Sequence, residues 1–420
     1  MGKKNIIKYV DLCCGIGGFR LGINEFQKTH SNYKFKCVYA IDIKKDAVDC
    51  YNLNFNENLV PNDIFDIDIN ELPDFDLLCC GFPCQSFSSA GNKHGFNDKR
   101  GQVIFKLIEI CSIKQPQTII LENVPNIITM LNGSIIKKII EEFELLNYHL
   151  SYKILNSKDF GVPQFRERIY IIGSLNKKIK FKNIKYFDNN VYLNTCIENV
   201  EYTDINLRFA IKLLKLHEKS GIYGYKIQDK RGGDKNIHSW DLSYFGKINN
   251  KSKELMNQIL LERRKKHWSE EKNIIWTDGM PLTFNDIKTF NSDKHLQKML
   301  DNLVELGYLK LEHYKKVING KKQYIKNSEV GYNICRGKLS FPITKILDPN
   351  NICPTLTATD SMKLGIIINN NHIRKLTMKE LAQISGFPIT FIIPSYVNIY
   401  DLFGNTVIPS VINAILDIIF

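Results

Sequence analysis

The stretch that decides the fold is IIKYVDLCCGIGGF, residues 6–19. Its first half, IIKYVDL, is rich in β-branched, aromatic and other apolar residues, as β-strands are. In its second half Gly15, Gly17 and Gly18 let the backbone turn tightly and approach a ligand closely before a helix begins. A strand that passes through a glycine-rich turn into a helix predicts the opening unit of a nucleotide-binding α/β fold.

The same alternation of strands and helices continues to residue 175. Further strands are predicted at 36–42, 75–81, 118–123 and 168–173, with helices at 46–55, 103–113 and 135–146 between them. Strands that alternate with helices predict a doubly wound, largely parallel sheet of Rossmann-like type. Ligands bind beyond the carboxyl ends of the strands in such sheets, so residues at those ends are the candidates for a site.

The bulk properties of the chain exclude several classes of protein. Its 420 residues, 44% of them hydrophobic, can bury a large core and fill two or three domains. No apolar run approaches the roughly 20 residues that span a bilayer, and the start of the chain lacks a signal peptide. The eleven cysteines form no CxxC pair and no cluster at metal-ligand spacing. We therefore expect a cytoplasmic protein with reduced thiols, no metal and no membrane segment.

The net charge of +13 is concentrated in one region of the sequence. Residues 176–345 hold 33 of the 57 Lys and Arg but only 19 of the 44 Asp and Glu, a net +14, and the remainder sums to −1. A basic region beside a neutral one predicts a module that binds a polyanion, and nucleic acid is the polyanion we expect. The alternative is a lysine-rich surface that faces only solvent.

A nucleoside pocket is indicated by the end of the second predicted strand. Asp42 stands there, at about the spacing from the glycine turn at which a carboxylate hydrogen-bonds a ribose diol. The glycine pattern lacks the last glycine of the dinucleotide fingerprint. One nucleoside therefore fits better than a dinucleotide.

Two further strand ends carry reactive groups. Cys84 follows the strand 75–81 in the loop GFPCQSFSSAG (81–91), and Glu122 is the penultimate residue of the strand TIILEN (118–123). Taken singly, Cys84 could be a packing residue and Glu122 a helix cap or an ion-pair partner. Beside a nucleoside pocket, the two together favour a thiol nucleophile and a carboxylic acid that act on one substrate.

Six segments resemble, in the same order, the motifs of the DNA (cytosine-5) methyltransferases of restriction-modification systems. They are DLCCGIGGFRLG (11–22), GFPCQSFSSAG (81–91), LENV (121–124), QFRER (164–168), RKLTMKELAQISGFP (374–388) and FGNTVIPSV (403–411). The resemblance implies S-adenosylmethionine as the methyl donor, S-adenosylhomocysteine as its product, and double-stranded DNA with a flipped-out cytosine as the substrate. It also implies a catalytic and cofactor-binding domain at 1–175 plus 391–420 and a separate, mixed target recognition domain at 176–390.

The resemblance assigns roles at the catalytic centre. Cys84 adds to C6 of cytosine, so that C5 can attack the methyl group, and Glu122 contacts N3 and the exocyclic amine. Arg168, the second arginine of QFRER, binds O2 of the base. Arg166 is included among the catalytic residues, although Arg166 and Gln164 could instead be surface groups.

Further contacts are implied for the cofactor and for DNA. The expected cofactor residues are Asp11, Cys13, Gly15, Ile16, Gly17, Gly18, Asp42, Ile43, Asp63, Ile64, Gly81, Pro83, Asn405 and Val407. The expected DNA contacts are Gln85, Ser86, Ser88, Lys99 and Arg100 from the nucleophile loop, with Thr355 and Leu356 from CPTLTATD (353–360). Cys13 stands where the family commonly has an aromatic ring against the adenine, and Ile43 stands where an aromatic residue often follows the acid of the second strand.

The basic region itself contains a pattern of helices and a hairpin. MPLTFNDIKTF (280–290) and SDKHLQKMLDNLVELGYL (292–309) read as helices, and two strands flank the hairpin turn signal Asn319-Gly320. This order predicts a winged-helix-like unit at about 280–326, with Lys321 and Lys322 as contacts to the DNA backbone. The alternative is a helical pair that only supports its domain.

Two other functions share parts of this pattern. A tRNA cytosine-5 methyltransferase would have the same cofactor and catalytic motifs, but the long basic insert favours duplex DNA. A catalytically silent nucleic-acid-binding relative is the option without enzyme activity, against which Cys84, Glu122 and Arg168 argue. We expect a monomer, with a cognate restriction endonuclease in the same system.

Overall fold

A computed structural model describes residues 5–83, 102–187, 191–202, 204–233, 235–318, 321–337, 340–369 and 372–420. The chain forms two compact units. Unit 1 comprises Met1–Glu198, Pro349–Ser361 and Thr377–Phe420, and unit 2 comprises Asn199–Asp348 and Met362–Leu376.

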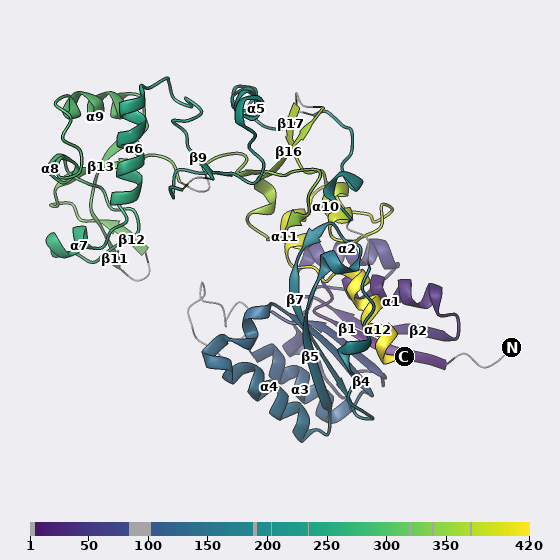
Figure 1. The fold of residues 1–420 in the computed structure, drawn as a ribbon. Coiled ribbons are helices and arrows are strands. Elements are labelled where there is room, and N and C mark those ends of the chain that lie inside the picture. The colour runs from purple at the N-terminus through teal and green to yellow at the C-terminus, as the bar shows by residue number, and fades with distance from the viewer. Residues whose placement is uncertain are drawn as a thin grey trace. The chain divides into compact units, whose positions relative to one another are not determined.

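Unit 1 is built on a six-stranded sheet with the order β2-β1-β3-β4-β7-β5 (Figure 1). Its strands are β1 (Asn5–Leu12), β2 (Tyr33–Ile41), β3 (Leu77–Gly81), β4 (Thr118–Asn123), β5 (His149–Asn156) and β7 (Glu167–Ser174). The first four pair in parallel, whereas β7 runs antiparallel to both β4 and β5. The predicted α/β class is confirmed, and the sheet is mixed because of β7.

Helices cover both faces of this sheet (Figure 1). The cluster on one face includes α3 (Val103–Lys114) and α4 (Ser134–Leu145), and the cluster on the other includes α1 (Gly18–Thr29) and α12 (Pro409–Ile419). Adjacent residues of β3 serve opposite faces, since Leu78 packs in the α3–α4 cluster and Leu77 in the α1–α12 cluster. A strand buried on both sides must be a continuous apolar run, which is why β3 and β4 were recognised from the sequence.

The C-terminal segment returns to unit 1 through α10 (Met378–Ile384), α11 (Ile399–Gly404) and α12. A Cβ atom on Gly18 would lie 2.2 Å from the carbonyl oxygen of Val407, so this approach of the chain end to α1 requires glycine.

One apolar stretch corrects the expectation that no segment could span a membrane. Ile399–Ile419 is long enough by residue count and has a mean hydropathy of 1.6. It consists of two helices, α11 and α12, separated at residues 405–408, and 67% of it is buried inside the protein. Ile412 and Leu416 of α12 belong to the core on the α1 face of the sheet. The apolar character of the stretch is therefore that of core helices.

Unit 2 contains two apolar cores. The first joins α5 (Leu207–Ser220) to a five-stranded sheet of order β17-β16-β14-β8-β9. Its strands are β8 (Lys226–Ile227), β9 (Asn236–Ile237), β14 (Lys345–Ile346), β16 (Leu364–Ile368) and β17 (His372–Lys375). The second core gathers α6 (Asn250–Glu262), α7 (His267–Glu271), α8 (Phe284–Lys288), α9 (Leu296–Glu305), β10 (Leu309–His313) and β13 (Val330–Ile334) around Trp240 and Trp268.

The two helices predicted at 280–309 contribute to this second core. The first predicted helix is short, α8, and begins with a capping box of Thr283 and Asp286. After α9 and β10, the strands β11 (Lys315–Ile318) and β12 (Lys321–Tyr324) pair antiparallel, while Asn319-Gly320 lies outside the described residues. The DNA-binding role of this stretch stays a prediction.

The two units do not divide at the residues expected from the sequence. Residues 176–198 belong to unit 1 because Ile179, Phe181 and Ile184 are buried in the cluster beside α1 and α12. Thr377–Pro388 belongs there as well, and Gln164 Nε2 donates a hydrogen bond to the carbonyl of Ile384 at 3.0 Å. The limits of unit 2, at 199 and 376, are therefore narrower than the predicted 176–390.

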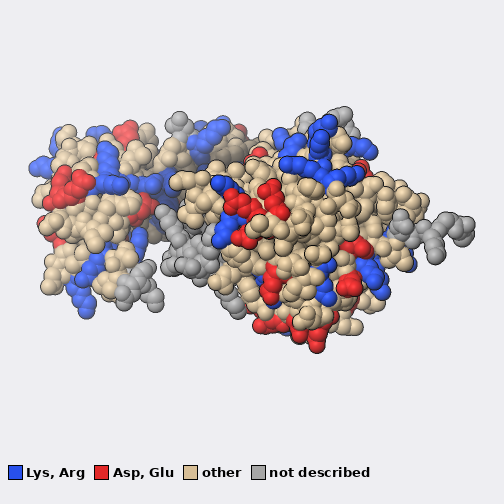
Figure 2. Space-filling model, turned by 90° about the horizontal axis from the view of Figure 1, so that it is seen from below, with Lys and Arg blue, Asp and Glu red and all other residues tan. Residues whose placement is uncertain are grey.

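The two units differ in net charge. Unit 2 holds 31 Lys and Arg against 18 Asp and Glu, a net +13, which leaves 26 of each kind in unit 1. Figure 2 shows Lys and Arg side chains (blue) together with Asp and Glu side chains (red) on both parts of the protein. The whole net charge of the protein thus lies in unit 2.

Candidate active site

A cavity of about 520 Å³ opens at the carboxyl ends of β1, β2, β3 and β4. It is the place at which an α/β sheet binds its ligand. Thirteen of the residues predicted from the sequence border it: Cys13, Gly15, Ile16, Asp42, Ile43, Asp63, Ile64, Gly81, Pro83, Glu122, Arg166, Arg168 and Asn405.

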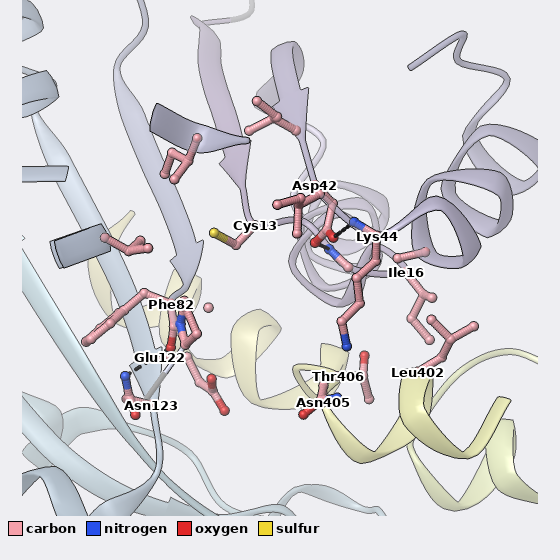
Figure 3. Close-up of a pocket in the computed structure, with 18 of the residues that line it drawn as sticks. Cys13, Ile16, Asp42, Lys44, Phe82, Glu122, Asn123, Leu402, Asn405 and Thr406 are labelled. Atoms are coloured by element: carbon pink, nitrogen blue, oxygen red, sulfur yellow. Dashed lines mark hydrogen bonds between the residues drawn. The ribbon is translucent and has the colours of Figure 1, made fainter. Parts of the chain in front are cut away.

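The glycine turn holds Asp42 in a fixed orientation (Figure 3). The N–H of Gly15 donates to Oδ2 of Asp42 at 2.8 Å, and the N–H of Lys44 donates to Oδ1 at 2.8 Å. Gly15 and Gly17 have φ values of 53° and 89°, the left-handed region that favours glycine. Burial raises the pKa of the Asp42 carboxyl group, and the two backbone N–H groups oppose that shift.

Four predicted cofactor residues do not border the cavity. Asp11 is fully buried, accepts a hydrogen bond from the Tyr51 hydroxyl at 3.3 Å, and has a pKa raised to about 8 by burial. A Cβ atom on Gly17 would lie 2.2 Å from the ring of Phe55, and Gly18 packs against Val407. These four residues support the turn and the chain end behind the cavity wall.

Cys13 and Ile43, which replace aromatic residues common in the family, both border the cavity. Cys13 has a left-handed backbone, φ 51°, and its sulfur points into the cavity in Figure 3. Ile43 is 62% exposed. The cavity is bordered as well by residues that the motifs did not single out, among them Lys44, Asn62, Phe65, Phe82, Asp401, Leu402 and Thr406. Most of these adjoin a motif residue in the sequence, which is the signal that could have identified them.

Glu122 and Arg168 meet at one end of the cavity. Nε of Arg168 lies 3.1 Å from Oε1 of Glu122, and both side chains are largely buried. Although close, that guanidinium is not aligned for a hydrogen bond, so Oε1 of Glu122 has no aligned donor among the described residues. Burial raises the pKa of Glu122, while Arg168 and Arg166 act in the opposite direction.

Arg166 lies beside this pair but is bound to the backbone. It donates to the carbonyl oxygens of Leu356 at 3.1 Å, Gly404 at 3.2 Å and Thr406 at 2.7 Å. Arg166 and Gln164 are 2% and 0% exposed, so the alternative that they are surface groups is wrong. Burial, helped by the charge of Arg168, lowers the pKa of Arg166 to about 9. We therefore assign Arg166 to positioning the chain segments around the cavity.

The nucleophile falls outside the described residues. Cys84, Gln85, Ser86, Ser88, Lys99 and Arg100 all lie in 84–101, which the structure does not describe. The last described residue before them, Pro83, borders the cavity, and so does Gly81, which pairs with Glu122 across β3 and β4.

The remaining predicted DNA contacts lie in two places. Leu356 is fully buried, and the Thr355 hydroxyl donates to the carbonyl of Phe165 at 2.6 Å. Both follow β15 (Cys353–Pro354), which pairs with β6 (Gln164–Phe165) inside unit 1. Lys321 and Lys322 lie on β12 in unit 2, where the Lys322 side chain is exposed.

In the described part of the chain no group of three or more His, Cys, Asp or Glu is placed to hold a metal.

The fold is that of solved methyltransferases. The S. pombe Dnmt2 methyltransferase superposes with a TM-score of 0.53 at 15% identity, over 98% of this chain and 97% of that one. The Entamoeba histolytica methyltransferase EhMeth gives a TM-score of 0.53 at 17% identity, over 99% and 98%.

The chain belongs to the C-5 cytosine-specific DNA methylase family, whose profile matches residues 7–420. It is 41% identical to the Type II methyltransferase M.NlaIV of Neisseria lactamica over 97% of both chains. It is 35% identical to the Type II methyltransferase M.BanI of Aneurinibacillus aneurinilyticus, over 99% of this chain and 96% of that one. The family recognised from the six motifs is confirmed, and the protein is a DNA (cytosine-5) methyltransferase. The family implies S-adenosylmethionine as the methyl donor.

Proposed function

We propose that this enzyme methylates C5 of a flipped-out cytosine in a short duplex DNA sequence, as the modification enzyme of a Type II restriction-modification system. One observation carries the proposal: the Glu122–Arg168 pair and the Asp42 turn border one cavity. A base and a nucleoside cofactor bound at its two ends would meet inside it. The full-length similarity to Type II methyltransferases supports the restriction-modification context.

The Asp42 side of the cavity fits the cofactor. Both Asp42 oxygens are oriented by backbone N–H groups and keep lone pairs for the two hydroxyls of a ribose. Asp63 and Asn405 border the same space, which has the size of a small-molecule site. S-adenosylmethionine, when bound there, supplies a methyl group on a sulfonium sulfur.

The Glu122 side fits the base. The thiolate of Cys84 adds to C6 of cytosine, the ring electrons move to C5, and C5 takes the methyl group as the bond from that methyl to sulfur breaks. Negative charge develops toward N3, where a protonated Glu122 donates a hydrogen bond. Burial favours the protonated form of Glu122. Loss of the C5 proton then allows the bond from C6 to Cys84 to break.

Unit 2 is proposed as the target recognition domain. Its net charge of +13 suits the DNA backbone, and the hairpin β11–β12 offers exposed lysines to it. A monomer acting in the cytoplasm, with a cognate endonuclease as functional partner, completes the proposal.

Transfer of label from S-adenosylmethionine tests the proposal against its alternatives. The purified enzyme is incubated with labelled S-adenosylmethionine and either plasmid DNA or total tRNA. Label in DNA, located by bisulfite sequencing of the plasmid at cytosines in one repeated sequence, is the expected result. Label in tRNA alone would establish the RNA enzyme instead. DNA binding without label in either nucleic acid would indicate a silent relative.

A further inference from the structure

One ion pair joins two residues of the cavity lining. Nζ of Lys44 lies 2.6 Å from Oδ2 of Asp401, and both residues border the cavity. Figure 3 shows the Lys44 side chain extending from the Asp42 turn toward the segment that bears Asn405 and Thr406. The two residues are separated by 357 positions in the sequence. The pair therefore joins the two walls of the cavity.

Lys44 links two sets of hydrogen bonds, one through its backbone N–H and the other through its side chain. Asp42 accepts from the N–H of Gly15 and from the N–H of Lys44, both at 2.8 Å. At the other end, Oδ1 of Asp401 accepts from Nδ2 of Asn405 at 2.9 Å. The proposed ribose-binding carboxylate is thus linked through Lys44 to the opposite wall of the cavity.

The segment that carries Asp401 is attached to α2 (Lys45–Phe55) by further surface hydrogen bonds. Asn54 exchanges two with the backbone of Ile392, each 2.7 Å long. Oδ2 of Asp46 accepts from the N–H of Asn398 at 2.9 Å, and Oδ2 of Asp49 from the Tyr396 hydroxyl at 3.0 Å. These four hydrogen bonds lie at exposed positions, whereas Val397 and Ile399 of the same segment are buried. The contacts that join the segment to the surface of α2 are therefore polar and open to solvent.

We propose that Lys44 and Asp401 form a latch that closes the cavity over S-adenosylmethionine and slows its release. The inference rests on the cofactor site proposed above, and it makes both residues positioning residues. Their side chains are 48% and 33% exposed, so the pair is screened by solvent and suits reversible closure. A latch of this kind sets how long the cofactor stays, whereas the methyl transfer itself depends on other groups.

The test measures S-adenosylhomocysteine binding by calorimetry in the full-length enzyme. Lys44→Met and Asp401→Asn should each raise the dissociation constant roughly threefold to tenfold, and the double variant should lose no more than either single one. The exchange Lys44→Asp with Asp401→Lys should recover most of the affinity.

The matched control is Lys137→Met. Lys137 pairs with Glu141 at 3.7 Å on α4 and does not border the cavity, so its loss should leave binding unchanged. Raising salt from about 50 to about 500 mM should weaken binding in wild type more than in Lys44→Met, because only wild type has the pair to screen.

The contrary results are distinct. If wild type does not bind S-adenosylhomocysteine, the proposed cofactor site is wrong, and the latch with it. If wild type binds and the Lys44 and Asp401 variants bind equally well, only the latch is wrong. The latch is also wrong if the charge exchange recovers nothing, or if Lys137→Met weakens binding as much as Lys44→Met.

Discussion

Arg168 holds its guanidinium 3.1 Å from a carboxyl oxygen of Glu122 without the alignment of a hydrogen bond. The contact has two opposed effects on Glu122. Burial favours the protonated acid, and the nearby positive charge favours the carboxylate. Burial is the larger effect, so the pKa of Glu122 is raised, and the protonated acid can donate a hydrogen bond where charge develops on the base.

Glu122→Gln should therefore slow methyl transfer far more than it weakens DNA binding. Loss of one such transition-state interaction typically costs about a hundredfold in rate. Single-turnover transfer from labelled S-adenosylmethionine and fluorescence anisotropy with the same duplex would measure the two effects. The matched control is Glu167→Gln. Glu167 is an exposed residue of β7 that precedes Arg168 in the sequence, and its replacement should change neither the rate of methyl transfer nor DNA binding. Equal losses in rate and binding would indicate a structural role for Glu122.

The same residue predicts a pH dependence of turnover. A raised pKa keeps Glu122 protonated to higher pH than an ordinary glutamic acid, so the active form is lost as pH rises through that raised pKa. The single-turnover rate of wild type should fall as the pH rises through the pKa of Glu122. The slower rate of Glu122→Gln should not show this fall. An identical fall in both proteins would assign it to another group.

Asp11 makes a separate prediction for stability. Its pKa is raised by burial from 3.8 to about 8, so between these values the folded state binds a proton that the unfolded state has released. The free energy of unfolding therefore falls as pH rises from about 4 to about 8, by at most about 1.4 kcal/mol per pH unit for one group. Urea unfolding of Asp11→Asn, compared with wild type across this range, should show a flatter dependence. Parallel curves would mean that Asp11 stays ionised in the fold.

The sequence identified most of the cavity because strand ends converge in space. Asp42 and Glu122 each end an apolar strand, and strands with buried faces have patterns that a sequence displays. The strand β5 was not predicted: only Leu150, Leu155 and Asn156 of it are buried, so it shows neither a continuous apolar run nor a regular alternation. The Lys44–Asp401 pair depends on how the chain end packs, and no local pattern encodes that.

The domain boundary at residues 176–198 could not be predicted from the local sequence pattern either. Five lysines in 177–185 made this stretch look like part of the basic module. Its buried residues Ile179, Phe181 and Ile184 instead bind it to unit 1, and their irregular spacing follows neither a helical nor a strand period. Leu356 was expected at DNA and is buried for a similar reason, because β15 pairs with β6 across about 190 residues.

Cys84 should form a covalent bond to C6 of the target cytosine. DNA with 5-fluorocytosine at the methylated position should trap an adduct that survives denaturing electrophoresis, because fluorine cannot leave C5 as a proton does. Cys84→Ser should give no adduct, while binding the duplex with affinity similar to wild type. Methylation by that variant at the wild-type rate would require another nucleophile.

Lys321 and Lys322 should contribute unequally to DNA binding. They are consecutive residues of β12 and pair with Ile318 and Val317 of β11. Lys322 shares its face with Tyr324, whose hydroxyl donates to Glu312 at 3.0 Å, and Glu312 also holds Lys310 and Lys315 at 2.8 and 3.1 Å. This carboxylate, with a pKa lowered to about 2 by those partners despite partial burial, offsets the positive charge on that face.

We therefore expect Lys321→Ala to weaken binding to all duplexes and to reduce the logarithmic salt slope by about 0.9, the value for one phosphate contact. Lys322→Ala should have a smaller effect, and Lys315→Ala, which removes a lysine already paired with Glu312, should leave the slope unchanged. Affinities measured by anisotropy over a series of salt concentrations would give the three slopes, and bisulfite sequencing would report the methylated sequence. A change of that sequence in any variant would mean that the hairpin reads bases, and three unchanged slopes would mean that it does not touch DNA.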